Sequence, residues 1–306
     1  MNQSILNQFR LTVQEKNLNI YGIKVENADG ESISHRWRAD DFVNIYSGSK
    51  TFTSMAVGLC IDDGKLSLDD SILDLFPEYK KSASAGSEQI TIRDLLHMSS
   101  GKETFWFGQA TDDERFSSPE DWAKLFFDVP VTKKPGTCFY YSNACTYMLG
   151  RAVEKVSGET VRNFLLPRFF VPLDIFNPQW HVCTRGHSLS ATGLFLTTDQ
   201  FSRLGLTLLN GGVYKGKRVI SENYLHNAIN DLNMAEPAGA DEQCNKGYGY
   251  QIWRCAYPGA YRADGKYGQF SIVLPDKKSV VTVTSHQEIL TNDIIRAIFK
   301  DIVPQL

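Results

Sequence analysis

The sequence predicts an α+β protein in which an antiparallel sheet is flanked by helices and an all-helical domain is inserted into the chain. Strand-like runs lie near both ends, at 18–37 and beyond 247, whereas 65–185 shows helical periodicity and loops without a strand hairpin. One hairpin has too few strands to be stable alone, so it should join the C-terminal strands in one sheet. The expected units are a mixed α/β domain from 1–46 and 190–306 and a mostly helical domain from 47–189.

Bulk properties narrow the class of protein. A length of 306 residues suits two domains, or one domain with a large insertion. The net charge of −3, with mixed signs along the chain, gives no reason to expect nucleic-acid binding. The first ten residues contain no apolar core typical of a signal peptide, and no apolar run is long enough to span a membrane. The six cysteines form no C-x-x-C pair, so we expect reduced thiols in a cytoplasmic protein.

The chain opens with a predicted helix and a hairpin. Apolar residues at helical spacing over 3–16 predict the helix. Residues 18–25 and 32–37 have strand composition, and the turn residues Asn27-Ala-Asp-Gly30 lie between them.

The next helix carries the first candidate chemistry. Ser47-Gly-Ser-Lys50 precedes the apolar run 55–61, and Asp62-Asp63-Gly64 should end the helix. If the helix begins at Ser47, the hydroxyl and the ammonium lie one turn apart on one face, at a helix end that favours negative charge. Against an apolar wall the pKa of Lys50 would fall, so that its amine can accept a proton. The plain alternative is a Ser/Thr-rich helix start with an ordinary surface lysine.

Four further helices are predicted in the middle of the chain, at 66–77, 90–98, 119–127 and 144–156. Between them, Phe105-Trp106-Phe107 follows a polar turn. Exposing three aromatic rings is unfavourable, so these rings pack on the core or line a pocket. We favour a pocket rim that includes Trp106.

The C-terminal third should alternate between helix and strand. An amphipathic helix is predicted over 198–209, strands over 247–255, 269–274 and 279–284, and a closing helix over 292–300.

Two further segments contain residues suited to catalysis. In Tyr141-Ser-Asn143, Asn143 is either a helix cap or a donor to a bound carbonyl, and the Tyr141 hydroxyl is a candidate proton carrier beside Ser47 and Lys50. In Lys266-Tyr-Gly-Gln269, the glycine either permits a turn or marks a strand edge that a substrate approaches.

These three segments, in this order, resemble the serine hydrolases that include class C β-lactamases, D-alanyl-D-alanine carboxypeptidases and β-lactamase-like esterases. That family carries S-x-x-K, then Y-x-N, then K-T-G or H-x-G on a sheet strand. Ser47-Gly-Ser-Lys50 and Tyr141-Ser-Asn143 match the first two patterns, and Lys266-Tyr-Gly268 is similar to the third. The resemblance covers residues 20–285 and implies a β-lactamase/transpeptidase-like fold with the active site where the two domains meet.

The resemblance also implies a role for each matched residue. Ser47 would be the acylated nucleophile, Lys50 and Tyr141 the proton-handling pair, and Asn143 a residue that orients substrate. Lys266 and Gly268 would form the strand edge, and the amides of Ser47 and Gln269 the oxyanion hole. In an alternative alignment of the third motif, Ala263-Asp-Gly265, the second oxyanion-hole amide would be that of Lys266. We prefer the alignment that begins at Lys266, because it keeps a basic residue at the first motif position. Tyr267, where the family has a small hydroxyl residue, argues against recognition of a β-lactam carboxylate.

The sequence thus predicts a serine hydrolase that cleaves a small-molecule ester or amide through an acyl-enzyme on Ser47. Three alternatives stay open: a β-lactamase or D-Ala-D-Ala carboxypeptidase, an acyltransferase, and a catalytically silent binding protein. We expect no cofactor and no metal, because the histidines have no metal-ligand spacing. Gly186-His-Ser-Leu-Ser190 approaches a G-x-S-x-G nucleophile elbow but lacks its last glycine and a preceding strand.

Overall fold

A six-stranded antiparallel sheet is built from both ends of the chain, as the sequence predicts. The computed structural model describes residues 1–105, 119–233 and 241–306. The strand order is β2-β1-β11-β10-β9-β8, so the N-terminal hairpin joins the C-terminal strands through the β1–β11 pair. The strands of this sheet are β1 (Ile20–Asn27), β2 (Ser32–Arg36), β8 (Trp253–Arg254), β9 (Tyr261–Gly265), β10 (Gln269–Leu274) and β11 (Ser279–Ser285).

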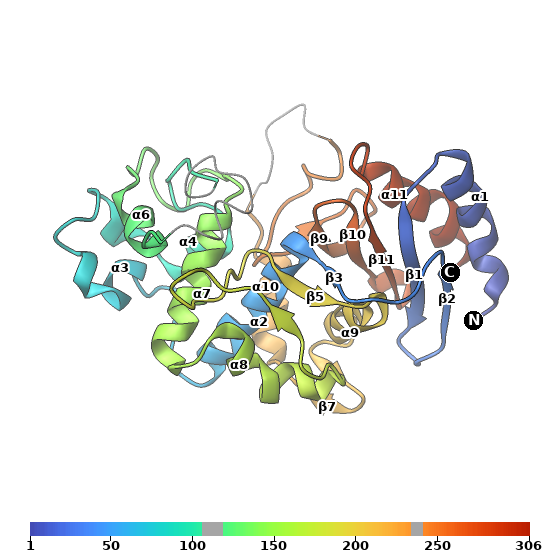
Figure 1. Cartoon of the computed structure of the whole chain (residues 1–306), viewed down its shortest axis with the longest axis horizontal. Helices are drawn as coiled ribbons and strands as arrows, with labels where there is room; N and C mark the ends of the chain where they lie inside the picture. Colours follow the sequence, from blue (N-terminus) through green and yellow to red (C-terminus); the bar gives the residue numbers. More distant parts are fainter. Residues whose placement is uncertain (106–118, 234–240) are drawn as a thin grey trace.

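Helices cover both faces of the sheet (Figure 1). On the outer face, α1 (Asn7–Glu15) and α11 (Asn292–Ala297) pack with apolar residues of β1, β10 and β11 in one core cluster. On the inner face, α9 (Thr198–Leu209) lies against β1, β10 and β11. A second, larger core cluster continues from α9 through α2 (Ser49–Asp62) into the helical region. The sheet and the helical region therefore share one continuous core, and the predicted division at residues 47 and 190 stays a prediction.

The helical region fills the left side of Figure 1, and both chain ends lie on the right. The buried helix α2 packs along α7 (Asn143–Ser157). The remaining helices are α3 (Ile72–Leu75), α4 (Ile92–Leu96), α6 (Trp122–Asp128), α8 (Val161–Leu165) and α10 (Glu222–Asn230). Small strands complete the described chain: β3 (Val43–Asn44), β4 (Gln179–Trp180) and β5 (Leu194–Leu196) in one sheet, and β6 (Val213–Tyr214) with β7 (Lys217–Arg218) in another.

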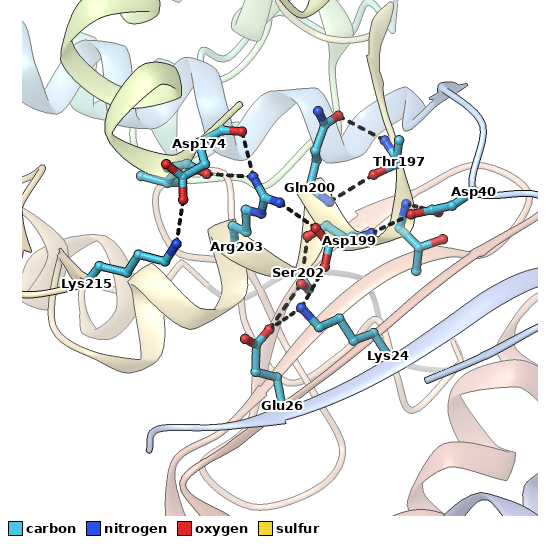
Figure 2. A network of polar contacts seen from close by, with 12 residues as sticks. Lys24, Glu26, Asp40, Asp174, Thr197, Asp199, Gln200, Ser202, Arg203 and Lys215 are labelled. Carbon is cyan, nitrogen blue, oxygen red and sulfur yellow. Dashed lines mark hydrogen bonds and ion pairs between the residues drawn. The ribbon is translucent and has the colours of Figure 1, made fainter. Parts of the chain in front are cut away.

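Polar contacts fix the start of α9 on β1 (Figure 2). Thr197 and Gln200 form a reciprocal capping box, which satisfies two backbone donors at the helix start. Lys24 on β1 donates to Asp199 Oδ1 at 2.7 Å and lies 2.8 Å from Glu26 Oε2. This network holds α9 against the inner face, and α9 in turn supports the turn before α2, since the ring of Phe201 lies 3.0 Å from the position a Cβ on Gly48 would take.

Two strands of the sheet differ from the sequence prediction. The predicted strand 247–255 is a strand only at Trp253–Arg254, and β9, at 261–265, was not predicted. The sequence of β9, Tyr-Arg-Ala-Asp-Gly, has charged residues inside and ends in glycine, which conceals its strand character. Arg262 and Asp264 are tolerated there because they pair with each other, at 2.7 Å. None of the helices in the described residues is long and apolar enough to cross a membrane.

Candidate active site

Ser47 lies in a tight 3-10 turn, Tyr46–Gly48, that leads directly into α2. The helix itself begins at Ser49, two residues later than expected, but Ser47 and Lys50 still lie one turn apart. Tyr46 has a φ of 47°, a left-handed conformation that is unfavourable for a residue with a Cβ. Asn44 Oδ1 supports this bend by accepting from the amides of Tyr46, at 2.8 Å, and Gly193, at 3.2 Å. The nucleophile candidate is thus held by a strained, braced turn.

Lys50 is enclosed and bonded to the candidate nucleophile. Its Nζ lies 2.8 Å from Ser47 Oγ, 2.6 Å from Asn143 Oδ1 and 2.9 Å from Ala191 O, and the residue is 1% exposed. Burial lowers the pKa of Lys50 to about 7, with the charge of Asp264 opposing the shift. When the amine is neutral, its two N–H groups can stay on Asn143 and Ala191 while the lone pair faces the Ser47 hydroxyl. This is the arrangement that a general base requires.

Tyr141 completes the predicted cluster. Burial raises the pKa of the Tyr141 phenol well above its usual value, and a hydrogen bond with Ser47 opposes this shift. The ring stacks on Trp253, with centroids 5.5 Å apart, and the Lys50 ammonium lies 5.0 Å from the ring centroid. At neutral pH the phenol is therefore protonated, so Tyr141 is suited to pass a proton rather than to act as the resting base.

The side chain of Asn143 bonds Lys50 rather than capping a helix. The N-cap of α7 is Ser142, whose hydroxyl accepts from the amide of Cys145 at 3.3 Å. Asn143 is the first residue of α7, so the helix start positions its amide group beside Lys50.

A cavity of about 640 Å³ opens over this cluster. Its described lining residues come from β3 and the turn before α2, the α7 start, the sheet edge, the α11 start and three loops: Asn44, Tyr46, Ser47, Phe105, Tyr141, Asn143, Thr192, Cys244, Trp253, Asp264, Lys266, Thr291 and Asn292. Phe105 of the predicted aromatic rim is among them, whereas Trp106 falls outside the described residues. The cavity brings Ser47, Lys266 and the phenol of Tyr141 to one space large enough for a small-molecule substrate.

The third segment is placed differently from the preferred sequence frame. Gly268 lies in the hairpin turn with a φ of 85°, packed toward Ile294 and Ser285, and Gln269 is 1% exposed. The side chain of Gln269 bonds the backbone of Ser285 in the sheet. Neither residue is among the described residues that line the cavity. Of the frame beginning at Lys266, only Lys266 itself is among the described residues that line the cavity, and the roles of Gly268 and Gln269 stay predictions.

The alternative frame, Ala263-Asp-Gly265, has its middle residue, Asp264, in the cavity lining, and Lys266, which follows it, also lines the cavity. Among the described residues, strand β8 pairs with Tyr261 and Arg262 alone, so no described strand pairs with the end of β9 on that side. A Cβ on Gly265 would lie 2.1 Å from Ile45 O, so this strand edge passes directly against the turn that carries Ser47. Only glycine permits so close an approach.

Sequence reasoning missed Asp264 and Asn44. Asp264 was named only inside the alternative, less favoured frame, because its strand carries no apolar run, and Asn44 has no motif of its own. In the nucleophile-elbow candidate, Ser188 is 1% exposed and its Oγ accepts from Val161 N at 3.1 Å, which is a structural role. Within 1–105, 119–233 and 241–306, no group of three His, Cys, Asp or Glu side chains could hold a metal.

Comparisons with known proteins agree with this fold. A family model described as Beta-lactamase matches residues 14–300. Lovastatin esterase from Penicillium rubens is 29% identical over 192 residues, which are 56% of this chain and 48% of that enzyme. The chain thus spans about half the length of this relative.

Two solved structures share the fold across nearly the whole chain. A D-amino acid amidase from Ochrobactrum anthropi SV3, complexed with L-phenylalanine amide, has a TM-score of 0.76 at 15% identity and covers 99% of each chain. A family VIII carboxylesterase has a TM-score of 0.73 at 15% identity, covering 97% of this chain and 96% of its own. At these identities the likeness establishes the fold alone.

Proposed function

Because this chain belongs to the β-lactamase family, we propose that it is a serine hydrolase that cleaves an ester or a small amide through an acyl-enzyme on Ser47. The observation that carries the proposal is the 2.8 Å contact between Lys50 Nζ and Ser47 Oγ inside a cavity of about 640 Å³. A buried lysine with a pKa of about 7, next to a serine hydroxyl, is the combination that nucleophilic catalysis requires.

The proposed reaction has two steps. In the first, Lys50 takes the Ser47 proton while the Ser47 oxygen bonds the carbonyl carbon, and the C–O or C–N bond to the leaving group then breaks. Tyr141 passes the proton to the leaving group. In the second, water attacks the acyl carbon, its proton returns through the same pair, and the Ser47 ester bond breaks to release the acid.

We assign the oxyanion hole to the amides of Ser47 and Lys266. The contact of Gly265 with Ile45 supports this frame, because it brings the β9 edge against the nucleophile turn. Backbone donors at fixed positions stabilise a developing oxyanion without reorganising during the reaction.

The charge at the β9 edge favours an ester or amide over a β-lactam. Residue 264, in the middle of this motif, is an aspartate, and it would repel the carboxylate that β-lactams carry. Lovastatin esterase among the relatives supports ester chemistry, and the D-amino acid amidase shows that the fold accommodates amide chemistry. The cytoplasmic location stays a prediction.

Covalent labelling tests the proposal directly. A fluorophosphonate probe should add its mass to the peptide that carries Ser47, and the Ser47→Ala variant should stay unlabelled. Substrate class follows from one panel: short-chain nitrophenyl esters, a D-alanyl dipeptide and a chromogenic cephalosporin. Labelling that survives in Ser47→Ala would overturn the nucleophile, and an unlabelled, inactive wild type would favour the silent binding protein. Labelled enzyme that hydrolyses none of the panel would favour the acyltransferase.

A further inference from the structure

Asp264 places a carboxylate in the wall of the active-site cavity, next to the proposed catalytic residues. The residue lines the cavity together with Ser47 and Tyr141, and its side chain is 24% exposed. Its charge acts on both neighbours, since it raises the pKa of Lys50 and of the Tyr141 phenol. The mechanism proposed above uses no acid at this position.

Arg262 holds this carboxylate in one orientation. Arg262 and Asp264 are two positions apart on β9 and so share one face of the strand. The guanidinium is fully buried, and its Nε and Nη2 lie 2.8 and 2.7 Å from Asp264 Oδ2. No hydrogen bond to Oδ1 is found within the part of the chain that the structure describes, so Oδ1 is the carboxylate oxygen left to accept a hydrogen bond from a ligand. The carboxylate is therefore preorganised, with one oxygen fixed and one free to accept.

The surroundings of Asp264 suit a cation rather than an anion. Trp253 and Tyr141 line the same cavity and stack on each other. Phe105 also stacks on Tyr141, with ring centroids 6.4 Å apart, so the three rings form an aromatic wall. Aromatic faces attract ammonium groups. Burial raises the pKa of the Asp264 carboxyl, which means that the carboxylate lacks solvation that a bound cation would restore.

Two positive groups, Arg262 and Lys50, act on the carboxylate, and a third, Lys266, lies in the same cavity wall. Arg262 is committed to Oδ2, and Lys50, with its pKa of about 7, is largely neutral above that pH. Lys266 also lines the cavity, and its Nζ lies over the Tyr267 ring, 4.6 Å from the centroid, without an ion pair to Asp264 in the described chain. The charge on Asp264 Oδ1 is thus not neutralised by Lys266, although both residues lie in the same cavity wall.

We propose that Asp264 is a specificity-determining residue that selects substrates carrying an ammonium group close to the scissile carbonyl, such as unblocked amino-acid esters and amides. This inference rests on the proposed function and names its substrate class. The ammonium donates to Asp264 Oδ1 and lies along the aromatic wall, while the carbonyl oxygen lies at the amides of Ser47 and Lys266.

A matched pair of substrates tests this selectivity on the wild-type protein. Alanyl derivatives, in both enantiomers, are compared with 2-methylpropanoyl derivatives, in which a methyl group replaces the ammonium. Both are offered as methyl esters and as p-nitroanilides, and kcat/KM is measured at pH 7.5. A charge-assisted hydrogen bond corresponds to a preference of about 10- to 100-fold for the ammonium substrate.

Two variants test whether a preference for the ammonium substrate comes from recognition by Asp264 or from the intrinsic reactivity of the two substrates. Asp264→Asn should remove the preference, lowering kcat/KM for the alanyl substrate about 10- to 100-fold while changing the neutral substrate far less. Asp293→Asn is the matched control, because it removes the same charge next to Asn292 of the cavity wall, from a residue paired outward to Lys16 and Arg296. This control should keep the wild-type preference.

A measurement on the wild type alone guards against a variant that does not fold. 2-Methylpropylamine should slow fluorophosphonate labelling of Ser47 more strongly than the neutral 2-methylpropanol. Equal protection by the two compounds, equal turnover of both substrate types, or an equal loss for both in Asp264→Asn would each overturn the inference while leaving Ser47 as the nucleophile. Absence of labelling at Ser47 would instead contradict the proposed function itself.

Discussion

The two walls of the cavity differ in how they are specified. On the helical wall, Ser47 and Lys50 are one turn apart on the same segment, and their side chains meet at 2.8 Å. On the sheet wall, Asp264 lines the cavity and Gly265 packs against the Ser47 turn only because β9 pairs with β10 and extends past the short β8. Local geometry therefore determines the first wall, and strand pairing far along the chain determines the second.

The two walls should also fail differently when they are changed. Removing a side chain from the helical wall takes away chemistry and leaves the fold intact. Adding a side chain to the sheet wall displaces backbone, so stability and activity fall together.

The largest effect is expected at Lys50. Lys50→Met removes the proposed base, and kcat/KM should fall about 10³-fold or more, at the upper end of what general-base catalysis supplies. Burial disfavours the charged form of Lys50 in the folded protein, whereas the unfolded chain keeps it protonated. Between the folded pKa of about 7 and the ordinary lysine pKa of 10.5, Lys50 therefore lowers stability as the pH falls.

Lys50→Met should therefore raise the melting temperature at pH 7 although it loses activity. Thermal melting and steady-state kinetics on the same sample check both parts. An inactive variant that melts well below the wild type would show that Lys50 serves the fold rather than the chemistry.

Tyr141→Phe should have the next largest effect. The ring and its stacking on Trp253 are kept, and only the hydroxyl that bonds Ser47 is lost. We expect about a 10²-fold fall in kcat/KM with little change in melting temperature. The acid limb of the pH profile, which reports Lys50, should stay near pH 7 in this variant. If the acid limb of the kcat/KM profile were absent in Tyr141→Phe, the titrating group would be Tyr141 rather than Lys50.

Gly265→Ala tests the sheet wall. The added Cβ would meet Ile45 O at 2.1 Å, so strand or turn must move, at a cost of about 1–3 kcal/mol of stability. Because the movement displaces Ser47 relative to the strand edge, kcat/KM should also fall, by up to about 10²-fold.

The matched control for this variant is Gly205→Ala on α9. Its Cβ would also clash, at 2.5 Å from Ser271 Oγ and Val280 Cγ1, but these atoms lie where α9 packs on the sheet, and neither residue is among the described residues that line the cavity. This variant should lose stability and keep its activity per folded molecule. Equal activity losses in the two glycine variants would show that the β9 edge has no special relation to Ser47.

The same contrast explains what could be predicted from sequence. Periodicity and capping gave α9 with its observed ends, and the need for more than two strands correctly joined the N-terminal hairpin to β11. The Ser47–Lys50–Tyr141 cluster followed from motif order. The register of the third segment did not, because a strand with Arg262 and Asp264 in it has no apolar signature and becomes recognisable only when the two are seen to pair. Trp106 falls outside the described residues and stays a prediction.

The smallest expected effect is electrostatic, and it couples Asp264 on the sheet wall to Lys50 on the helical wall. The Asp264 charge raises the pKa of Lys50, against the larger lowering by burial. Asp264→Asn removes that charge, so the proton should leave Lys50 more easily and the acid limb of kcat/KM should move to lower pH. A neutral ester must serve as the substrate, since an ammonium substrate would add its own loss of recognition. The Asp293→Asn control should leave the limb at the wild-type position, because that carboxylate pairs with Lys16 and Arg296 outside the cavity. A limb that stays unmoved in Asp264→Asn would mean that the two walls act on the substrate independently, and that the aspartate affects recognition without tuning the base.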